Sequence, residues 1–188
     1  SGRNICMSTK NIYLNVISAS LILCCIAGSH QPVNAKEESS LLITEVYYYA
    51  HTSVHDEFIA LCNPTETVVD LTNYYITDEP WKPSNQQAKL LFPNDAVIAP
   101  GSTIYLTQNA SDFLRETGRL PTYEYMGDSR ADIPQLNTFK TVTMSNIGGL
   151  IALKDITNRT IDLVTYGKTN RTQQEWNGEP IPCSGASG

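Results

Sequence analysis

The chain has 188 residues, 41% of them hydrophobic, which is enough to fill the core of one domain and argues against a disordered chain. Two of its 13 basic residues, Arg3 and Lys10, precede residue 36, so 11 basic residues stand against 19 acidic ones in the remainder, a formal charge of −8. The basic residues occur singly. Direct nucleic-acid binding needs clustered basic groups that neutralise phosphates, so this composition argues against it.

Residues 1–35 are typical of a secretory leader. From Met7, a weakly positive start is followed by an apolar run at 16–27, which is too short to span a bilayer comfortably, and by small residues around Ala35. Residues 36–40 form a polar spacer, and 41–188 are expected to form the domain. We therefore expect a secreted or cell-surface protein. The alternative is a leader that is not cleaved, and this is the only way in which we expect the protein to contact the membrane.

From residue 41 onward, short apolar runs separated by Pro, Gly, Asn and Asp predict an all-β domain. Strand candidates in the first part of the domain are 41–49, 57–62, 67–71, 73–77, 88–92, 96–98 and 102–107, of which the third and fourth follow one another almost without a gap. Asn63-Pro64 and Pro100-Gly101 are turn signals.

A single short helix is expected next. Asn109 or Ser111 can cap its start, Asp112 lies in its first turn, and Gly118 can end it. Residues 119–137 show no periodicity and are expected to form a long loop.

The last third returns to strands, at 139–144, 150–154 and 160–166, the last two joined by a hairpin loop. In the final strand, Ile161, Leu163 and Thr165 alternate with Asp162, Val164 and Tyr166, so one face is expected to be more apolar than the other. The domain thus contains about nine strands and one short helix, a pattern that an Ig-like antiparallel β-sandwich buries well.

Residues with metal-binding side chains are few, and no metal or cofactor site is expected. His51 and His55 are four apart, but on a loop this spacing does not place them on one face as it would on a helix. Carboxylates at 78–79, and at 128 and 132, lack the regular spacing of a calcium loop. No Gly-x-Ser-x-Gly motif and no His-x-Lys motif occurs, so no catalytic residue is expected.

Three kinds of surface feature remain open. Cys62 and Cys183 form an even pair that an oxidising compartment would allow to join, the alternative being two unpaired thiols. Tyr48, Tyr75 and Trp81 are candidates for an aromatic binding surface, although tyrosines also suit half-buried sheets. Glycosylation sequons begin at Asn109, Asn158 and Asn170.

Several segments, taken in order, resemble the lamin-tail domain family. They are Leu-Ile-Thr-Glu-Val at 42–46, the Asp-Glu-Phe-Ile-Ala-Leu-Cys-Asn-Pro run at 56–64, Val-Asp-Leu-Thr-Asn-Tyr at 69–74, and the runs at 98–106, 146–155 and 161–167. Ala60 and Cys62 depart from the acidic and aromatic residues usual in the family. The family usually continues through one more strand, so the domain is expected to be truncated at its C-terminus.

The resemblance implies an Ig-like sandwich used for attachment, and it is closest to exported prokaryotic or archaeal versions that precede phospholipase D-like domains. We therefore expect a non-catalytic extracellular interaction or anchoring module. Its expected partners are a protein or a cell-surface glycan, and other domains of the same polypeptide. The alternative is an accessory domain of an exported phospholipase D-like phosphodiesterase or nuclease whose catalytic domain lies beyond residue 188. Fold alone does not decide between these functions.

Overall fold

The structure, a computed structural model, describes residues 41–49 and 55–169. In these ranges it contains eleven strands and one helix. They are β1 (Leu42–Tyr47), β2 (Phe58–Cys62), β3 (Val69–Asp70), β4 (Tyr74–Thr77), β5 (Lys89–Leu91), β6 (Val97–Ile98), β7 (Thr103–Thr107), α1 (Ala110–Thr117), β8 (Tyr123–Glu124), β9 (Asn137–Phe139), β10 (Gly148–Asp155) and β11 (Thr160–Gly167).

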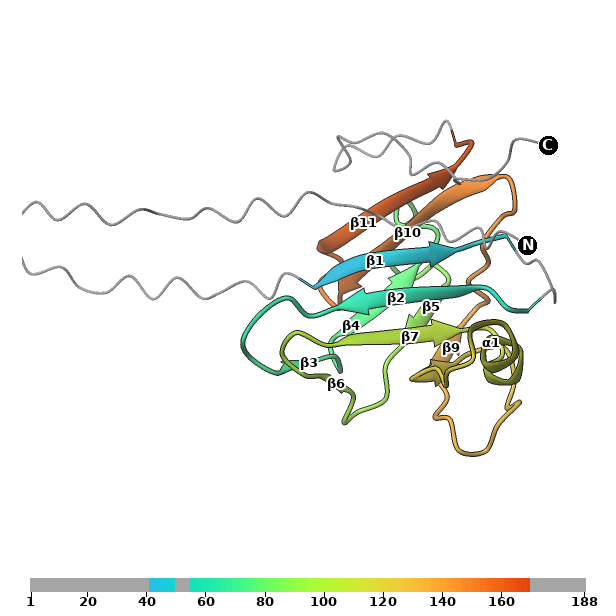
Figure 1. The fold of residues 1–188 in the computed structure, drawn as a ribbon. Coiled ribbons are helices and arrows are strands. Elements are labelled where there is room, and N and C mark those ends of the chain that lie inside the picture. The colour runs from blue at the N-terminus through green and yellow to red at the C-terminus, as the bar shows by residue number, and fades with distance from the viewer. Residues whose placement is uncertain (1–40, 50–54, 170–188) are drawn as a thin grey trace, which may run out of the picture.

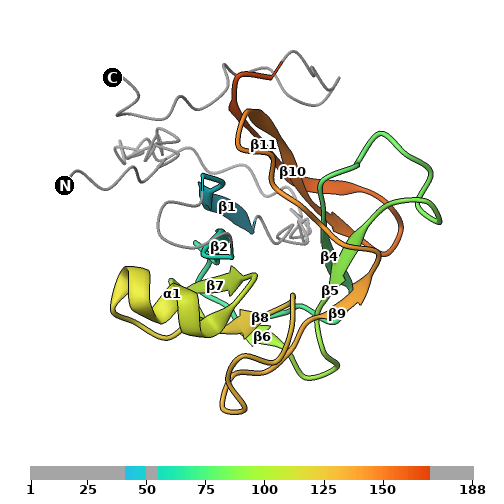
Figure 2. The ribbon, with the colours of Figure 1, turned by 90° about the vertical axis from the view of Figure 1, so that its right-hand side faces the viewer.

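Two sheets packed face to face make up the body of the domain (Figures 1 and 2). One has the strand order β1-β2-β7-β8, the other β11-β10-β4-β5-β9, and β3 and β6 form a separate two-stranded ribbon. Seven of the eight strand pairs are antiparallel, and the eighth, β7 with β8, is parallel. The expected all-β, Ig-like sandwich is therefore confirmed, with one parallel pair that the sequence pattern did not predict.

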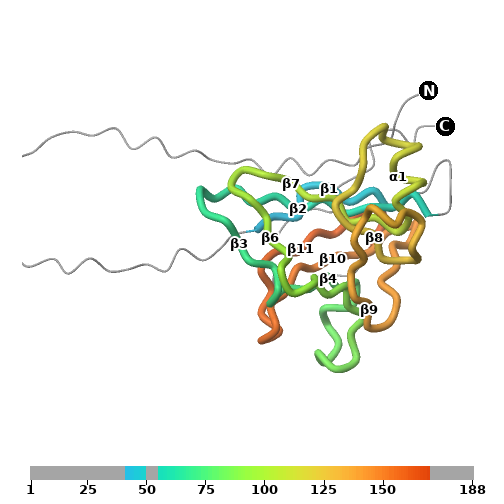
Figure 3. The backbone as a smooth tube through the Cα atoms, turned by 90° about the horizontal axis from the view of Figure 1, so that it is seen from below, coloured from blue at the N-terminus to red at the C-terminus, as the bar shows by residue number. Residues whose placement is uncertain are grey.

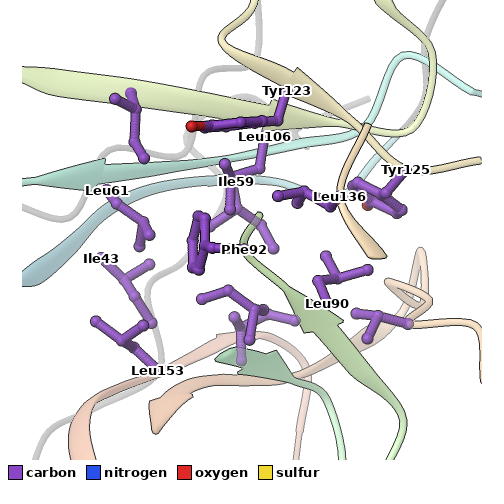
Figure 4. Packing of buried hydrophobic residues seen from close by; sticks show 14 of the residues in the cluster. Ile43, Ile59, Leu61, Leu90, Phe92, Leu106, Tyr123, Tyr125, Leu136 and Leu153 are labelled. Atoms are coloured by element: carbon purple, nitrogen blue, oxygen red, sulfur yellow. The ribbon is translucent and has the colours of Figure 1, made fainter. Parts of the chain in front are cut away.

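The hydrophobic core lies between the two large sheets (Figure 4). Ile59, Leu61 and Leu106 point inward from β2 and β7, and Leu90 and Leu153 meet them from β5 and β10. All five are fully buried. Burying one such side chain contributes about 1.5–3 kcal/mol, so these five together contribute roughly 8–15 kcal/mol.

The strand β1 closes one side of the sandwich against β11. A bulge between Ile43 and Glu45 shifts the alternation of β1, so that Ile43 and Val46 both enter the core while Tyr47 points outward. The Ile43 backbone N–H donates to Asp162 Oδ2 across the gap between the sheets, at 2.8 Å. One hydrogen bond thus links the edge strands of the two layers.

The helix α1 lies on the outer face of the four-stranded sheet (Figure 2). Its Phe113 is fully buried, with its ring 5.1 Å from that of Phe58 and 5.7 Å from that of Tyr105. Asn109 caps its start, accepting the Asp112 N–H at 2.9 Å, and Gly118 ends it in the left-handed conformation. Of the two residues predicted as start caps, Asn109 is the cap, and the predicted end at Gly118 is confirmed.

A buried carboxylate, Glu124 of β8, organises the chain around the start of this helix, at the end of the sandwich where α1 and β8 lie together (Figure 3). Its Oε2 accepts the Ala110 N–H at 2.8 Å and the Ser129 hydroxyl at 2.6 Å. Its Oε1 accepts the N–H groups of Ser129 and Arg130 and the Gln135 side-chain amide, at 3.0, 3.2 and 2.8 Å. The segment after α1, expected to be a long loop, is therefore tied to the start of the helix because donors from both converge on one carboxylate, which accepts five hydrogen bonds.

Buried Asn63 fixes the turn that follows β2. Its Nδ2 donates to the carbonyl oxygens of Thr67, Ile98 and Ala99, at 2.8, 3.1 and 3.2 Å. Its Oδ1 accepts from the backbone N–H and the hydroxyl of Thr65. The Asn-Pro turn signal is thus also a tertiary anchor between the β2–β3 turn and β6.

Two strand expectations were wrong in detail. The strand predicted at 139–144 is found at Asn137–Phe139, and Val142 and Met144 are buried within irregular backbone instead. In β11, Val164 and Tyr166 belong to the main core, whereas Leu163 packs with Leu150 and Ala152 in a separate cluster. Both faces of β11 are buried, so alternation alone could not identify the core side. Within the described ranges, no helix has the length and apolar character needed to cross a membrane.

Candidate functional site

Of the three aromatic residues predicted to form a binding surface, two are internal. The Tyr48 side chain is 5% exposed, and its ring centroid lies 4.5 Å from that of Tyr166. Tyr75 is 1% exposed, and its hydroxyl lies 2.9 Å from Gln87 Oε1 and 3.0 Å from Asn158 Oδ1. The loops that carry Gln87 and Asn158 cover Tyr75, which is why a strand tyrosine on the outer face is buried. Only Trp81, 41% exposed, is on the surface.

Trp81 lies at the rim of a pocket of about 420 Å³. This volume is within the usual range of small-ligand sites. The lining comes from the loop after β4, the segment before β10, and the paired strands β10 and β11. The described residues that line it are Asp78, Glu79, Trp81, Thr143, Met144, Ser145, Gly148, Gly149, Leu150 and Tyr166.

The loop that presents Trp81 is held by its own hydrogen bonds. The Lys82 N–H closes a turn on the Glu79 carbonyl oxygen at 3.0 Å, and Glu79 Oε2 accepts the Ala88 N–H at 3.2 Å. Buried Gln87 donates to the Lys82 carbonyl oxygen at 2.8 Å. Glu79 also pairs with the Lys82 ammonium. The backbone that carries Trp81 is therefore held in place before any ligand binds, which lowers the entropy cost of binding.

The wall of the pocket depends on a glycine opposite a tyrosine. Gly149 of β10 and Tyr166 of β11 are direct cross-strand partners. A Cβ on Gly149 would lie 2.7 Å from the Tyr166 hydroxyl oxygen, so only glycine leaves room for the ring there. The Ser145 backbone N–H donates to that hydroxyl at 3.1 Å. This contact joins the segment before β10 to β11.

One carboxylate of the pocket, that of Asp78, accepts few hydrogen bonds. Asp78 Oδ2 accepts the Thr143 N–H at 3.1 Å, and Oδ1 is buried with no hydrogen-bond partner among the described residues. Burial raises the pKa of Asp78 above its ordinary value, and the Thr143 N–H offsets this only in part. A carboxylate in this state gains from any additional donor or positive charge.

Further acidic and phenolic groups lie behind the pocket. Glu57 is 5% exposed, and burial together with neighbouring Asp56 raises its pKa to about 8, although Gln108 donates to its Oε2. The buried Tyr125 hydroxyl lies near Gln108 without a hydrogen bond of normal geometry to any described residue, and burial raises its pKa. The interior beside the pocket is thus acidic and incompletely hydrogen-bonded.

The other candidate residues are not part of this site. His51 lies outside the described residues, and His55 is exposed. In the ranges that the structure describes, no group of three or more His, Cys, Asp or Glu side chains is placed to hold a metal ion. Asp132 pairs with Arg130 at 2.7 Å, and Asp128 is exposed.

The modification sites are only partly visible. Cys62 is half-buried, but Cys183 lies outside the described residues, so the disulfide stays a prediction. Asn109 is the helix cap, and exposed Asn158 is in the β10–β11 loop with a positive φ of 68°. Asn170 also lies outside the described residues. Glycosylation at these three positions stays a prediction.

Sequence reasoning missed most of the pocket. Asp78 was considered only as a calcium ligand, and no pocket was predicted around Gly149. A glycine within an apolar run signals a close approach by another group, but the sequence does not identify Tyr166 as that group.

Comparison with known proteins places this fold in a family. The Lamin Tail Domain family model matches residues 34–168. A comparison with curated proteins found no match. Among solved structures, the chain is similar to a DUF4876 family protein from Bacteroides thetaiotaomicron, with a TM-score of 0.51 and 13% identity. The match covers 70% of this chain and 55% of that one, so this chain spans little more than half of that protein's length. At such low identity the likeness concerns the fold alone. Because the family model covers most of the sequence, the chain belongs to the lamin tail domain family.

Proposed function

We propose that this chain is a non-catalytic interaction module that acts outside the cell and binds a protein or a surface glycan through the Trp81 pocket. The observation that carries the proposal is an exposed tryptophan at the rim of a pocket, on a loop held in place by internal hydrogen bonds. Tryptophan offers a large, rigid contact area and is enriched among residues that dominate binding energy.

The chemistry of the pocket supports binding rather than catalysis. Its described lining contains no His, Cys or Lys side chain. Ser145 Oγ accepts the Ile147 N–H at 3.3 Å, and the Tyr166 hydroxyl accepts from Ser145, so neither hydroxyl is arranged with a general base. Of the two lining carboxylates, Glu79 pairs with Lys82, and Asp78 has the more open acceptor capacity. A carboxylate without a neighbouring nucleophile is better suited to recognition.

The extracellular location is proposed from the leader-like sequence of residues 1–35, which lie outside the described residues. Fractionation of cells that express the chain with and without this segment tests it. We expect the protein in the medium or on the surface only when the segment is present; equal retention inside the cell in both cases would contradict the location.

Surface binding tests the role of the pocket. We expect the fluorescently labelled chain to bind saturably to cells of the organism that makes this protein, and the Trp81→Ala variant to lose most of this binding. Val97→Ala is the matched control, since Val97 is 53% exposed and lies on β6, outside the pocket. The chain should not hydrolyse bis(p-nitrophenyl) phosphate. Equal binding by both variants would reject the pocket, and hydrolysis above the blank would reject the non-catalytic role.

A further inference from the structure

We infer that the Trp81 pocket recognises a cationic side chain, the ammonium of lysine or the guanidinium of arginine, displayed by a partner protein. The inference rests on the proposed function and specifies its ligand. It is argued from the charge of the pocket, the state of its carboxylate and the nature of its rim.

The charge of the pocket has one sign. Asp78 and Glu79 are the acidic residues of its described lining. No Lys or Arg is among the described lining residues. Neighbouring Lys82 pairs with Glu79, so Asp78 is the lining carboxylate that no ion pair among the described residues neutralises. Low-dielectric walls strengthen the field of such groups, so the pocket attracts cations and repels carboxylates and phosphates.

The carboxylate of Asp78 retains unused acceptor capacity. An ionised carboxylate offers about four lone-pair positions. The only hydrogen bond that Asp78 receives from another described residue comes from Thr143, to Oδ2. A bound ammonium or guanidinium would provide both donors and the opposite charge, and charge-assisted hydrogen bonds of this kind are the strongest available.

The rim supplies the second element of cation recognition. The exposed Trp81 indole has the most favourable aromatic face for a cation within about 6 Å. Its apolar surface also suits the methylene stem of lysine or arginine. The volume of about 420 Å³ exceeds what one such side chain needs, leaving room for the flanking peptide.

A metal ion fits these groups less well than an organic cation. No three potential ligand residues of the described chain are grouped for metal binding, whereas a monovalent organic cation needs one carboxylate and an aromatic wall. A neutral sugar could also stack on Trp81, and the experiment distinguishes it.

The test titrates the full chain with Nα-acetyl-lysine amide and Nα-acetyl-arginine amide. Nα-acetyl-norleucine amide serves as the neutral control of equal stem length, and N-acetylglucosamine as the sugar. The chain has two tryptophans, so Trp176→Phe leaves the Trp81 fluorescence as the only indole signal. We expect saturable changes with one or both cationic probes, weakening as salt is added, and none with the neutral probes.

Variants then tie the signal to the pocket. Asp78→Asn keeps an oxygen that can accept from Thr143 but removes the charge, and should weaken cation binding by about tenfold or more. Asp128→Asn makes the same change at an exposed site outside the pocket and should have no effect. If circular dichroism showed that Asp78→Asn does not fold, the Trp81→Leu variant would be used in its place. Its binding would be measured by isothermal calorimetry, and we expect the binding to be lost.

The outcomes separate this inference from the proposed function. Equal binding of norleucine amide, or binding of the sugar alone, would overturn the cationic ligand while leaving the pocket as a binding site. No binding of any probe, with Trp81→Ala still abolishing cell-surface binding, would also overturn only the cationic ligand. If Trp81→Ala left surface binding intact as well, both proposals would fail.

Discussion

Replacing Glu124 with glutamine should destabilise the domain strongly, because the five donors around this carboxylate have no other described acceptor placed for them. The amide puts an NH₂ group where one carboxylate oxygen was. If it replaces Oε2, the Ser129 hydroxyl can rotate to accept, but the Ala110 N–H at the first turn of α1 faces a donor. If the NH₂ group replaces Oε1, the backbone N–H groups of Ser129 and Arg130 both face a donor.

The magnitude follows from the first, less costly arrangement. One buried donor without a partner costs about 1–3 kcal/mol. Loss of the negative charge at the helix N-terminus adds about 0.3–1 kcal/mol, and the remaining hydrogen bonds weaken because the acceptor is neutral. The total is about 2–4 kcal/mol, which corresponds to a fall in Tm of roughly 6–15 °C for a domain of this size.

Urea unfolding followed by far-ultraviolet circular dichroism measures this change. Glu66→Gln makes the same chemical substitution at an exposed position and should change stability by less than about 0.5 kcal/mol. If Glu124→Gln lowered the free energy of unfolding by less than about 1 kcal/mol, the role given to this carboxylate in holding α1 and the 125–135 segment would be refuted.

Three further variants test other parts of the structure. Gly149→Ala should lower the free energy of unfolding by about 1–3 kcal/mol, because the new methyl group displaces the Tyr166 ring. In a double-mutant cycle, the same substitution should cost less in a Tyr166→Phe background, and equal costs in the two backgrounds would contradict this contact. Because the pKa of Glu57 is raised from 4.5 to about 8, the folded state keeps a proton that the unfolded state loses between these pH values. The free energy of unfolding should therefore fall by on the order of 2 kcal/mol as pH rises from 4.5 to about 8, and Glu57→Gln should make it less dependent on pH. An unchanged slope would count against the buried, protonated acid. Asn63→Asp places a carboxylate oxygen against three carbonyl oxygens and should cost about 2–4 kcal/mol in thermal unfolding, whereas Asn73→Asp at an exposed position should cost little; similar losses would contradict the anchor.

Local signals in the sequence predicted the elements of this fold well. The caps of α1 at Asn109 and Gly118 are set by side-chain and backbone properties of single residues, and they were identified correctly. The two-residue strand β8 was missed because its pairing with β7 is parallel and depends on tertiary contacts rather than on periodicity. The burial of Tyr75 depends on Gln87 and on Asn158, which is 83 residues away along the chain.

The pocket could not be predicted for the same reason. Asp78 and Thr143, which meet in its lining, are 65 residues apart in sequence. Gly149 and Tyr166 become partners only through the register of β10 and β11. Family resemblance gives the order of the strands, but it carries no motif for a pocket built from one loop, one irregular segment and a glycine–tyrosine pair.

The most direct test of the account is a chemical-shift map of the ¹⁵N-labelled chain during titration with Nα-acetyl-lysine amide. We predict that the Trp81 indole N–H and the amides of Thr143, Ser145 and Gly149 shift together and saturate with a single dissociation constant. Shifts confined to another surface, such as the β3–β6 ribbon around Val97, or no shifts at all, would contradict the assignment of this pocket as the binding site for a cationic side chain.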